Sequence, residues 1–92
     1  AEFKEVFEIA VRMYPDDPVS NLNAANTALL NRDTANARRY LAKAADGPEK
    51  RLAEGVACWL EDDTDQARTI FESLASDPAV GEQAKANLEQ LP

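Results

Sequence analysis

Histidine is absent from this 92-residue chain, and cysteine, methionine and tryptophan occur once each. The most common general base and metal ligand is therefore missing. Cys58 has no second cysteine for an internal disulfide and no histidine to activate its thiol, so we expect it to act as a small hydrophobic residue. No glycine-rich phosphate loop is present either. The sequence predicts no catalytic residue, no metal site and no cofactor, and hence no enzymatic activity.

Long apolar runs and an excess of basic residues are also lacking. No run approaches the roughly 18 apolar residues of a membrane-spanning helix, so direct membrane insertion is not predicted. The chain carries 10 Lys and Arg against 17 Asp and Glu, a formal net charge of −7. This balance disfavours binding to nucleic acid or to an anionic membrane surface, because both need clustered basic residues.

Small apolar residues at helical spacing are what the sequence does contain. Between residues 18 and 45 they form two blocks, separated by a polar break at residues 31–34. This pattern indicates a helical hairpin. Elsewhere apolar spacing, together with Pro, Asp and Gly at the expected ends, predicts further helices. We expect six helices, at about 2–14, 18–30, 34–45, 48–60, 64–75 and 79–92.

An internal repeat relates these helices. Three sets of residues recur at the same two offsets, 34 and 30 residues: Phe7, Leu41 and Phe71; Ala10, Ala44 and Leu74; Phe3, Ala37 and Ala67. A recurring helical pair of about 34 residues is the tetratricopeptide period. The chain resembles that family at the small and large apolar positions of its middle and third copies: Ala25, Ala37, Leu41, Ala44, Gly55, Ala67 and Phe71.

The resemblance implies an all-α solenoid, a right-handed superhelical array of antiparallel helix pairs. It divides the chain into a half repeat (1–17), two repeats (18–47 and 48–78) and a capping helix (79–92). Two departures stand out: Asn21 occupies the place of an early Trp, and the middle copy is four residues short. Because residues 2–14 resemble a second helix without its first, we expect the chain to be a piece of a longer protein.

The resemblance also implies a concave groove, lined by the first helix of each repeat, that holds a peptide or a partner helix. The lining positions that we predict to contact a partner are Asn23, Asn26, Leu30, Leu52, Val56 and Trp59. An Asn amide both donates to and accepts from a peptide backbone. The alternative is that the two Asn residues serve local hydrogen bonds. Trp59 is either an interface residue or part of the core against the fifth helix.

The expected function is therefore that of a non-catalytic interaction module with a peptide or protein partner. The alternative is a structural spacer or assembly segment of a larger protein. Self-association through the apolar face of residues 3–11 is a further expectation. The segment also looks similar to repeat segments of bacterial cell-envelope proteins that carry a peptidoglycan-binding domain of the outer-membrane-protein-A type. That likeness implies a periplasmic or outer-membrane-associated location in a Gram-negative bacterium, with a cytoplasmic location as the alternative.

Overall fold

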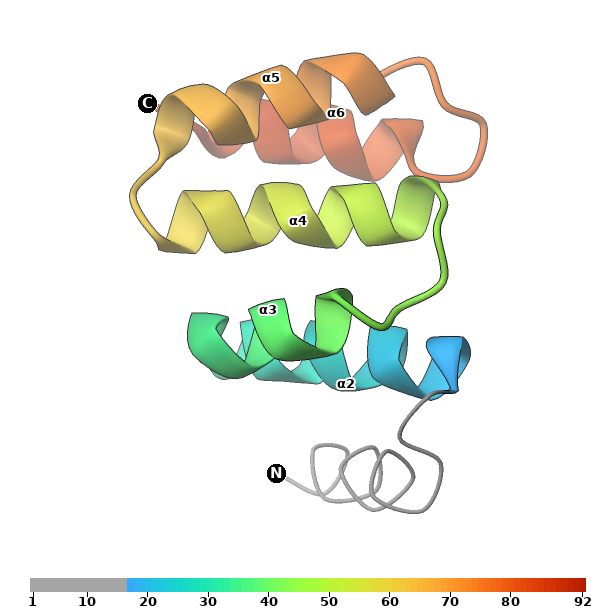
Figure 1. Cartoon of the computed structure of the whole chain (residues 1–92). Coiled ribbons are helices and arrows are strands. Elements are labelled where there is room, and N and C mark those ends of the chain that lie inside the picture. Colours follow the sequence, from blue (N-terminus) through green and yellow to red (C-terminus); the bar gives the residue numbers. More distant parts are fainter. Residues whose placement is uncertain (1–16) are drawn as a thin grey trace. The chain divides into compact units, whose positions relative to one another are not determined.

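The computed structural model describes residues 17–92, and all regular structure within them is helical (Figure 1). The helices are α2 (Pro18–Leu30), α3 (Thr34–Leu41), α4 (Pro48–Leu60), α5 (Thr64–Leu74) and α6 (Gly81–Gln90). The all-α class is confirmed for this part of the chain, which contains five of the six expected helices. The helix expected at 2–14 and the apolar face expected on residues 3–11 lie outside the described residues.

Two helices begin and end where the sequence predicts, a third (α5) ends one residue early, and two differ by more. α2 and α4 have the expected bounds, whereas α3 ends at Leu41 instead of residue 45. After Leu41 the backbone hydrogen bonds span three residues instead of four, since Lys43 N–H donates to the Tyr40 carbonyl and Ala44 N–H donates to the Leu41 carbonyl. The Ala45 N–H then donates to the Pro18 carbonyl at 3.2 Å, so the segment after α3 is tied to the start of α2.

The last helix also begins later than expected, at Gly81 rather than near residue 79. The Asp77 side chain accepts hydrogen bonds from Ala79 N–H at 2.7 Å and from Val80 N–H at 3.1 Å. An Asp side chain that bonds the backbone two and three residues ahead forms a turn that competes with helix. Asp77 therefore holds the two residues before Gly81 in a turn.

The described residues divide between two compact units, with residues 17–45 in the first and 46–92 in the second. The described part of the first unit is the α2–α3 hairpin. Its buried apolar residues are mostly alanine, with two leucines: Ala24, Ala25, Ala28, Leu29, Ala37, Leu41 and Ala44. Alanine buries little apolar area, so each alanine in this core contributes less hydrophobic stabilisation than a Leu or Phe would contribute in its place.

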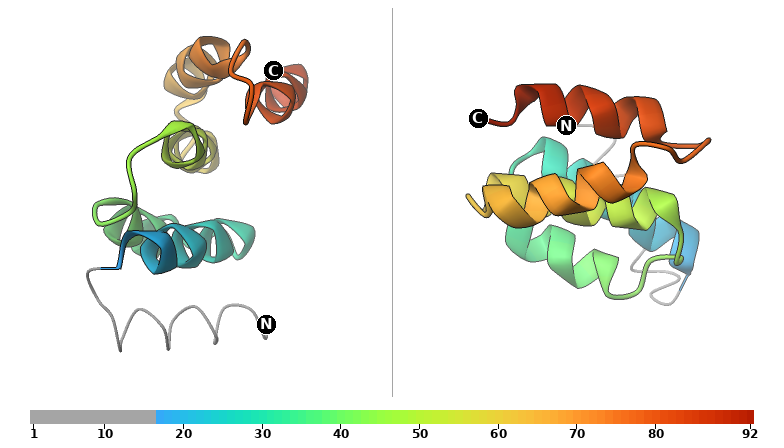
Figure 2. Two further views of the ribbon diagram at one scale, coloured as in Figure 1. Left: turned by 90° about the vertical axis from the view of Figure 1, so that its right-hand side faces the viewer. Right: turned by 90° about the horizontal axis from the view of Figure 1, so that it is seen from above.

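The second unit contains α4, α5 and α6, which lie at the corners of a triangle when viewed end-on (Figure 2, left). Phe71 and Ile70 of α5 are 0% and 1% exposed and are two of the largest fully buried side chains among the described residues. The other buried members of this core are Cys58, Ala67, Leu74, Val80 and Ala84. Three helices thus share one apolar cluster built around α5.

The two hairpins repeat each other at an offset of 30 residues. Asp33 N–H donates to Ala28 O at 2.8 Å, and Asp63 N–H donates to Cys58 O at 2.9 Å. Before each Asp stands a residue with positive φ, Arg32 (59°) or Asp62 (66°). This is the Schellman termination, in which a left-handed residue ends the helix and the next N–H bonds back across the last turn.

The same aspartates also begin the second helix of each hairpin. The Asp33 side chain accepts from Asn36 N–H at 3.2 Å, and the Asp63 side chain accepts from Gln66 N–H at 3.3 Å. One residue therefore closes the first helix through its N–H and caps the next through its carboxylate. The turn is three residues long in both hairpins. The α2–α3 and α4–α5 hairpins therefore share the same turn geometry at an offset of 30 residues, and their assignment as two repeats of one array stays a prediction.

Replacing the cap residue Asp63 by alanine is expected to lower the free energy of unfolding by about 1 kcal/mol, because the first turn of α5 loses a side-chain acceptor. The measurement is urea unfolding followed by circular dichroism. Asp63→Asn is the matched control, since its amide oxygen still caps the helix. Equal losses in the two variants would contradict the capping role.

Candidate functional site

One face of α2 combines apolar exposure with side-chain amides. Val19, Asn23, Asn26 and Leu30 follow one another at spacings of four, three and four residues, so they lie along the same side of the helix. Val19 is 59% exposed and Leu30 86% exposed, the two exposed large hydrophobic residues of the described chain. Asn26 is exposed and Asn23 is half-buried. We call these four residues the α2 face.

Local interactions fix both ends of α2 and so fix this face. Pro18 occupies the first turn, and the Asp17 carboxylate accepts from Ser20 N–H at 3.0 Å as the N-cap. At the other end the Asn31 amide donates to the Thr27 carbonyl at 2.9 Å. Polar contacts such as these satisfy the helix ends, so the side chains along the middle of α2 are not needed for that purpose.

No charged residue occurs in α2, although 29% of the chain is charged. Six residues away from the α2 face are buried: Asn21, Ala24, Ala25, Thr27, Ala28 and Leu29. Protein interfaces are depleted in charged residues at their centres, because charges are costly to desolvate. The α2 face therefore has the composition of a contact surface.

The amides of Asn23 and Asn26 differ from the other Asn side chains of α2 and its ends. Asn21, 1% exposed, donates through Nδ2 to the Asp17 carbonyl at 2.9 Å, and Asn31 caps the last turn. Within residues 17–92 no hydrogen bond engages the side-chain amide of Asn23 or Asn26. The local hydrogen bonds at the two ends of α2 are made by Asn21 and Asn31, not by Asn23 or Asn26.

The predicted contact residues of α4 lie in a different setting. Leu52, Val56 and Trp59 share one side of the helix, are half-buried, and pack against the core of the second unit. Trp59 therefore contributes to core packing while part of its ring remains exposed. A contact between these residues and a partner stays a prediction.

The predicted residues thus fall into two sets. Asn23, Asn26 and Leu30 lie together on the α2 face, whereas Leu52, Val56 and Trp59 lie together on α4 in the other unit. A single groove lined by both sets stays a prediction. Val19 was not predicted, although its spacing of four residues from Asn23 would have placed it on the same face.

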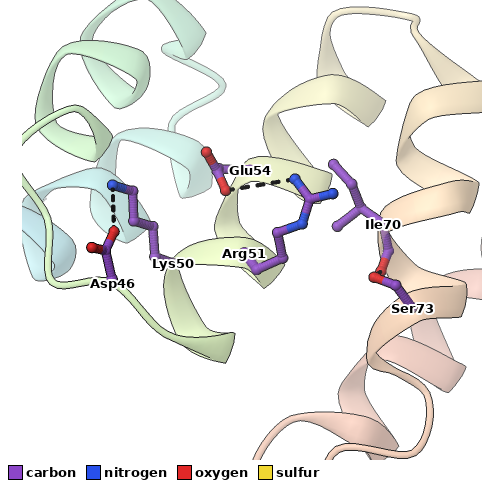
Figure 3. Close-up of polar contacts among 6 residues, drawn as sticks. All are labelled: Asp46, Lys50, Arg51, Glu54, Ile70 and Ser73. Carbon is purple, nitrogen blue, oxygen red and sulfur yellow. Dashed lines mark hydrogen bonds and ion pairs between the residues drawn. The ribbon is translucent and has the colours of Figure 1, made fainter.

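Charged side chains of α4 are engaged with close neighbours along the chain (Figure 3). Lys50 Nζ lies 3.3 Å from Asp46 Oδ1, and Arg51 Nη1 lies 3.8 Å from Glu54 Oε1. Such pairs on a helix surface contribute about 0.3–0.5 kcal/mol each. They place acids beside the basic residues of α4, so this surface is mixed in charge and offers no uniform patch.

Residues 17–92 contain no group of three or more Cys, Asp or Glu side chains arranged to hold a metal ion. None of the helices in this range is long and apolar enough to cross a membrane.

No protein-family model, curated protein or solved structure matches the chain. The resemblance to tetratricopeptide repeats therefore depends on the residue pattern alone and stays a prediction.

The N-cap of α2 should make stability depend on pH. The Ser20 hydroxyl and then the Ser20 N–H donate to the Asp17 carboxylate, and they hold the pKa of that carboxyl below its ordinary value of 3.8. A lowered folded-state pKa stabilises the fold above the unfolded pKa, and this contribution is lost as pH falls through the folded pKa. We expect the stability difference between the chain and Asp17→Asn to be constant above about pH 5 and to change below it.

Urea unfolding at a series of pH values measures this difference. Asn still caps a helix but does not titrate, and the other carboxyl groups cancel between the two proteins. A difference that stays constant down to about pH 2, below the range of ordinary Asp values, would contradict the assignment.

Proposed function

We propose that this chain is a non-catalytic interaction module that binds a peptide or partner protein through the first helices of its hairpins, with α2 as the main contact. The observation that carries the proposal is the α2 face, an exposed, uncharged surface with two apolar and two amide side chains on a chain of net charge −7. In a chain so rich in charge, an uncharged helix with an exposed face favours contact with another molecule over simple solvation.

The geometry of the α2 face suits an extended peptide. Val19 and Leu30 are 11 residues apart, which corresponds to about 16 Å along a helix. An extended chain advances about 3.3 Å per residue, so a segment of about five residues spans the face. Asn23 and Asn26 then contact the middle of that segment, where their amides can bond its backbone N–H and C=O groups.

Peptides selected from a random library on the immobilised protein would test the proposal when titrated into labelled protein and followed by amide chemical shifts. We expect shifts to concentrate on the α2 face, with the α4 set responding if both first helices take part. Asn26→Ala and Leu30→Ser should each weaken binding about tenfold, the loss of roughly one good contact. Glu72→Ser, at an exposed position of α5, is the control and should leave affinity unchanged.

Shifts confined to the exposed side of α5 would contradict binding through the first helices. Failure to select any peptide would favour the alternative, a spacer or assembly segment. One observation favours this alternative: the two hairpins have equal three-residue turns. A stack of equal hairpins has a length set by the number of hairpins, which suits a spacer.

A further inference from the structure

The α2 face is self-complementary under a two-fold axis. Its spacing of four, three and four residues reads the same in both directions about a midpoint between Ala24 and Ala25. When a second α2 lies antiparallel with this midpoint shared, Val19 of one copy meets Leu30 of the other, and Asn23 meets Asn26. Spacings of three and four residues are also those by which one helix packs along another.

We propose that the α2 faces of two copies of this chain pack antiparallel to form a symmetric dimer. The apolar pairs lie at the two ends of the contact and the amides lie in its centre. An Asn side chain carries an acceptor oxygen and a donor NH₂ group. Asn23 of one copy and Asn26 of the other can therefore each donate a hydrogen bond to the other. In this arrangement every apolar side chain of the α2 face meets an apolar side chain, and every amide meets an amide.

Charge favours the same pairing. Two copies of net charge −7 repel each other, and α2 is a surface where they can meet without opposing like charges. Asp17 stands just before α2 and Arg32 stands two residues beyond it. Antiparallel packing brings each Arg32 to the end where Asp17 of the second copy lies, whereas parallel packing brings like charges together. The antiparallel orientation is therefore the favoured one.

The dimer is weak, because α2 has only 13 residues and a contact between two such helices falls below the area of a stable interface. We expect a dissociation constant on the order of 100 µM, as for small transient contacts. Asn23, Asn26 and Leu30 are covered in it, so a peptide that binds the α2 face competes with dimer formation. That competition rests on the proposed function, whereas the dimer itself does not.

Sedimentation equilibrium of the full chain without peptide, from about 10 µM to 1 mM and in about 0.1 M salt to screen repulsion beyond about 10 Å, tests the dimer. The average mass should rise towards twice the monomer mass. Leu30→Lys places a charge in each apolar pair and should weaken association at least tenfold. Ala42→Lys, at the exposed C-cap of α3, adds the same charge outside the face and should not weaken it. Circular dichroism checks that both variants fold. A strictly monomeric chain, or a dimer that persists in Leu30→Lys, overturns the proposal.

Orientation is tested by disulfide trapping in a Cys58→Ala background. Val19→Cys and Leu30→Cys proteins, mixed and exposed to a mild oxidant, should form the mixed disulfide in excess over either homodimer. Trapping of Leu30→Cys with itself as the main product would show parallel packing and overturn the antiparallel pairing. Dimerisation without peptide binding would overturn only the proposed function, and peptide binding by a strict monomer would overturn only the dimer.

Discussion

Replacing Phe71 with alanine is expected to lower the free energy of unfolding by about 3–5 kcal/mol, the usual cost of deleting a buried aromatic ring. Phe71 is 0% exposed and lies in the cluster that joins α4, α5 and α6. The loss combines the apolar area no longer buried with the cavity left in the core. Since small domains are stable by only about 5–15 kcal/mol, this one change removes a large share of the total.

Urea unfolding monitored by Trp59 fluorescence measures this loss, because Trp59 packs against the same cluster. Phe71→Leu is the control, since it keeps a smaller apolar side chain that fills part of the space of the ring and should cost less than Phe71→Ala. A loss below about 1 kcal/mol for Phe71→Ala would mean that the ring is not enclosed as the structure places it.

Helix ends were predictable where local chemistry decides them. Pro18 and Pro48 fit only the first turn of a helix, and α2 and α4 begin there. The ends of these two helices follow from short turns that are polar in sequence. The 30-residue repeat was also readable, because Ala37 and Ala67 are buried at equivalent places in the two hairpins.

Ends that depend on distant contacts were not predictable. Residues 42–45 continue the small apolar pattern of α3, so the sequence extends that helix. The structure instead ties Ala45 N–H to the carbonyl of Pro18, 27 residues earlier. No local sequence pattern predicts that hydrogen bond. For α6, the Asp77 turn decides the start, and this signal is local in the sequence.

The candidate site divides in the same way. The common side of Asn23, Asn26 and Leu30 follows from helical spacing alone, and the structure places all three on one face of α2. The half-burial of Trp59 does not follow from spacing, because it depends on how α5 and α6 pack against α4. Exposure of Val19 and Leu30 likewise depends on what covers α2, which no periodicity specifies.

Replacing Gly55 with valine is expected to lower the free energy of unfolding by about 3 kcal/mol, the upper end of the cost of overpacking a core. A Cβ atom at this position would lie 2.7 Å from Phe71 Cε1 and 2.9 Å from Ile70 Cγ2. Both of those side chains are almost fully buried and have little room to move. Urea unfolding measures the loss, and an unchanged stability would mean that α4 and α5 separate easily.

Gly55→Ala tests whether helix propensity or the close contact with the Phe71 ring has the larger effect on stability. Alanine favours a helix over glycine by about 1 kcal/mol, so a net loss would show that the contact with the ring outweighs helix propensity.

The equivalent positions in the first hairpin hold Ala25 and Leu41, a larger residue on α2 and a smaller one on α3. The double variant Gly55→Ala and Phe71→Leu recreates that pair and should be more stable than the sum of the single changes predicts. Additive losses would mean that Gly55 and Phe71 were not matched to each other, since residues in direct contact are the ones that couple.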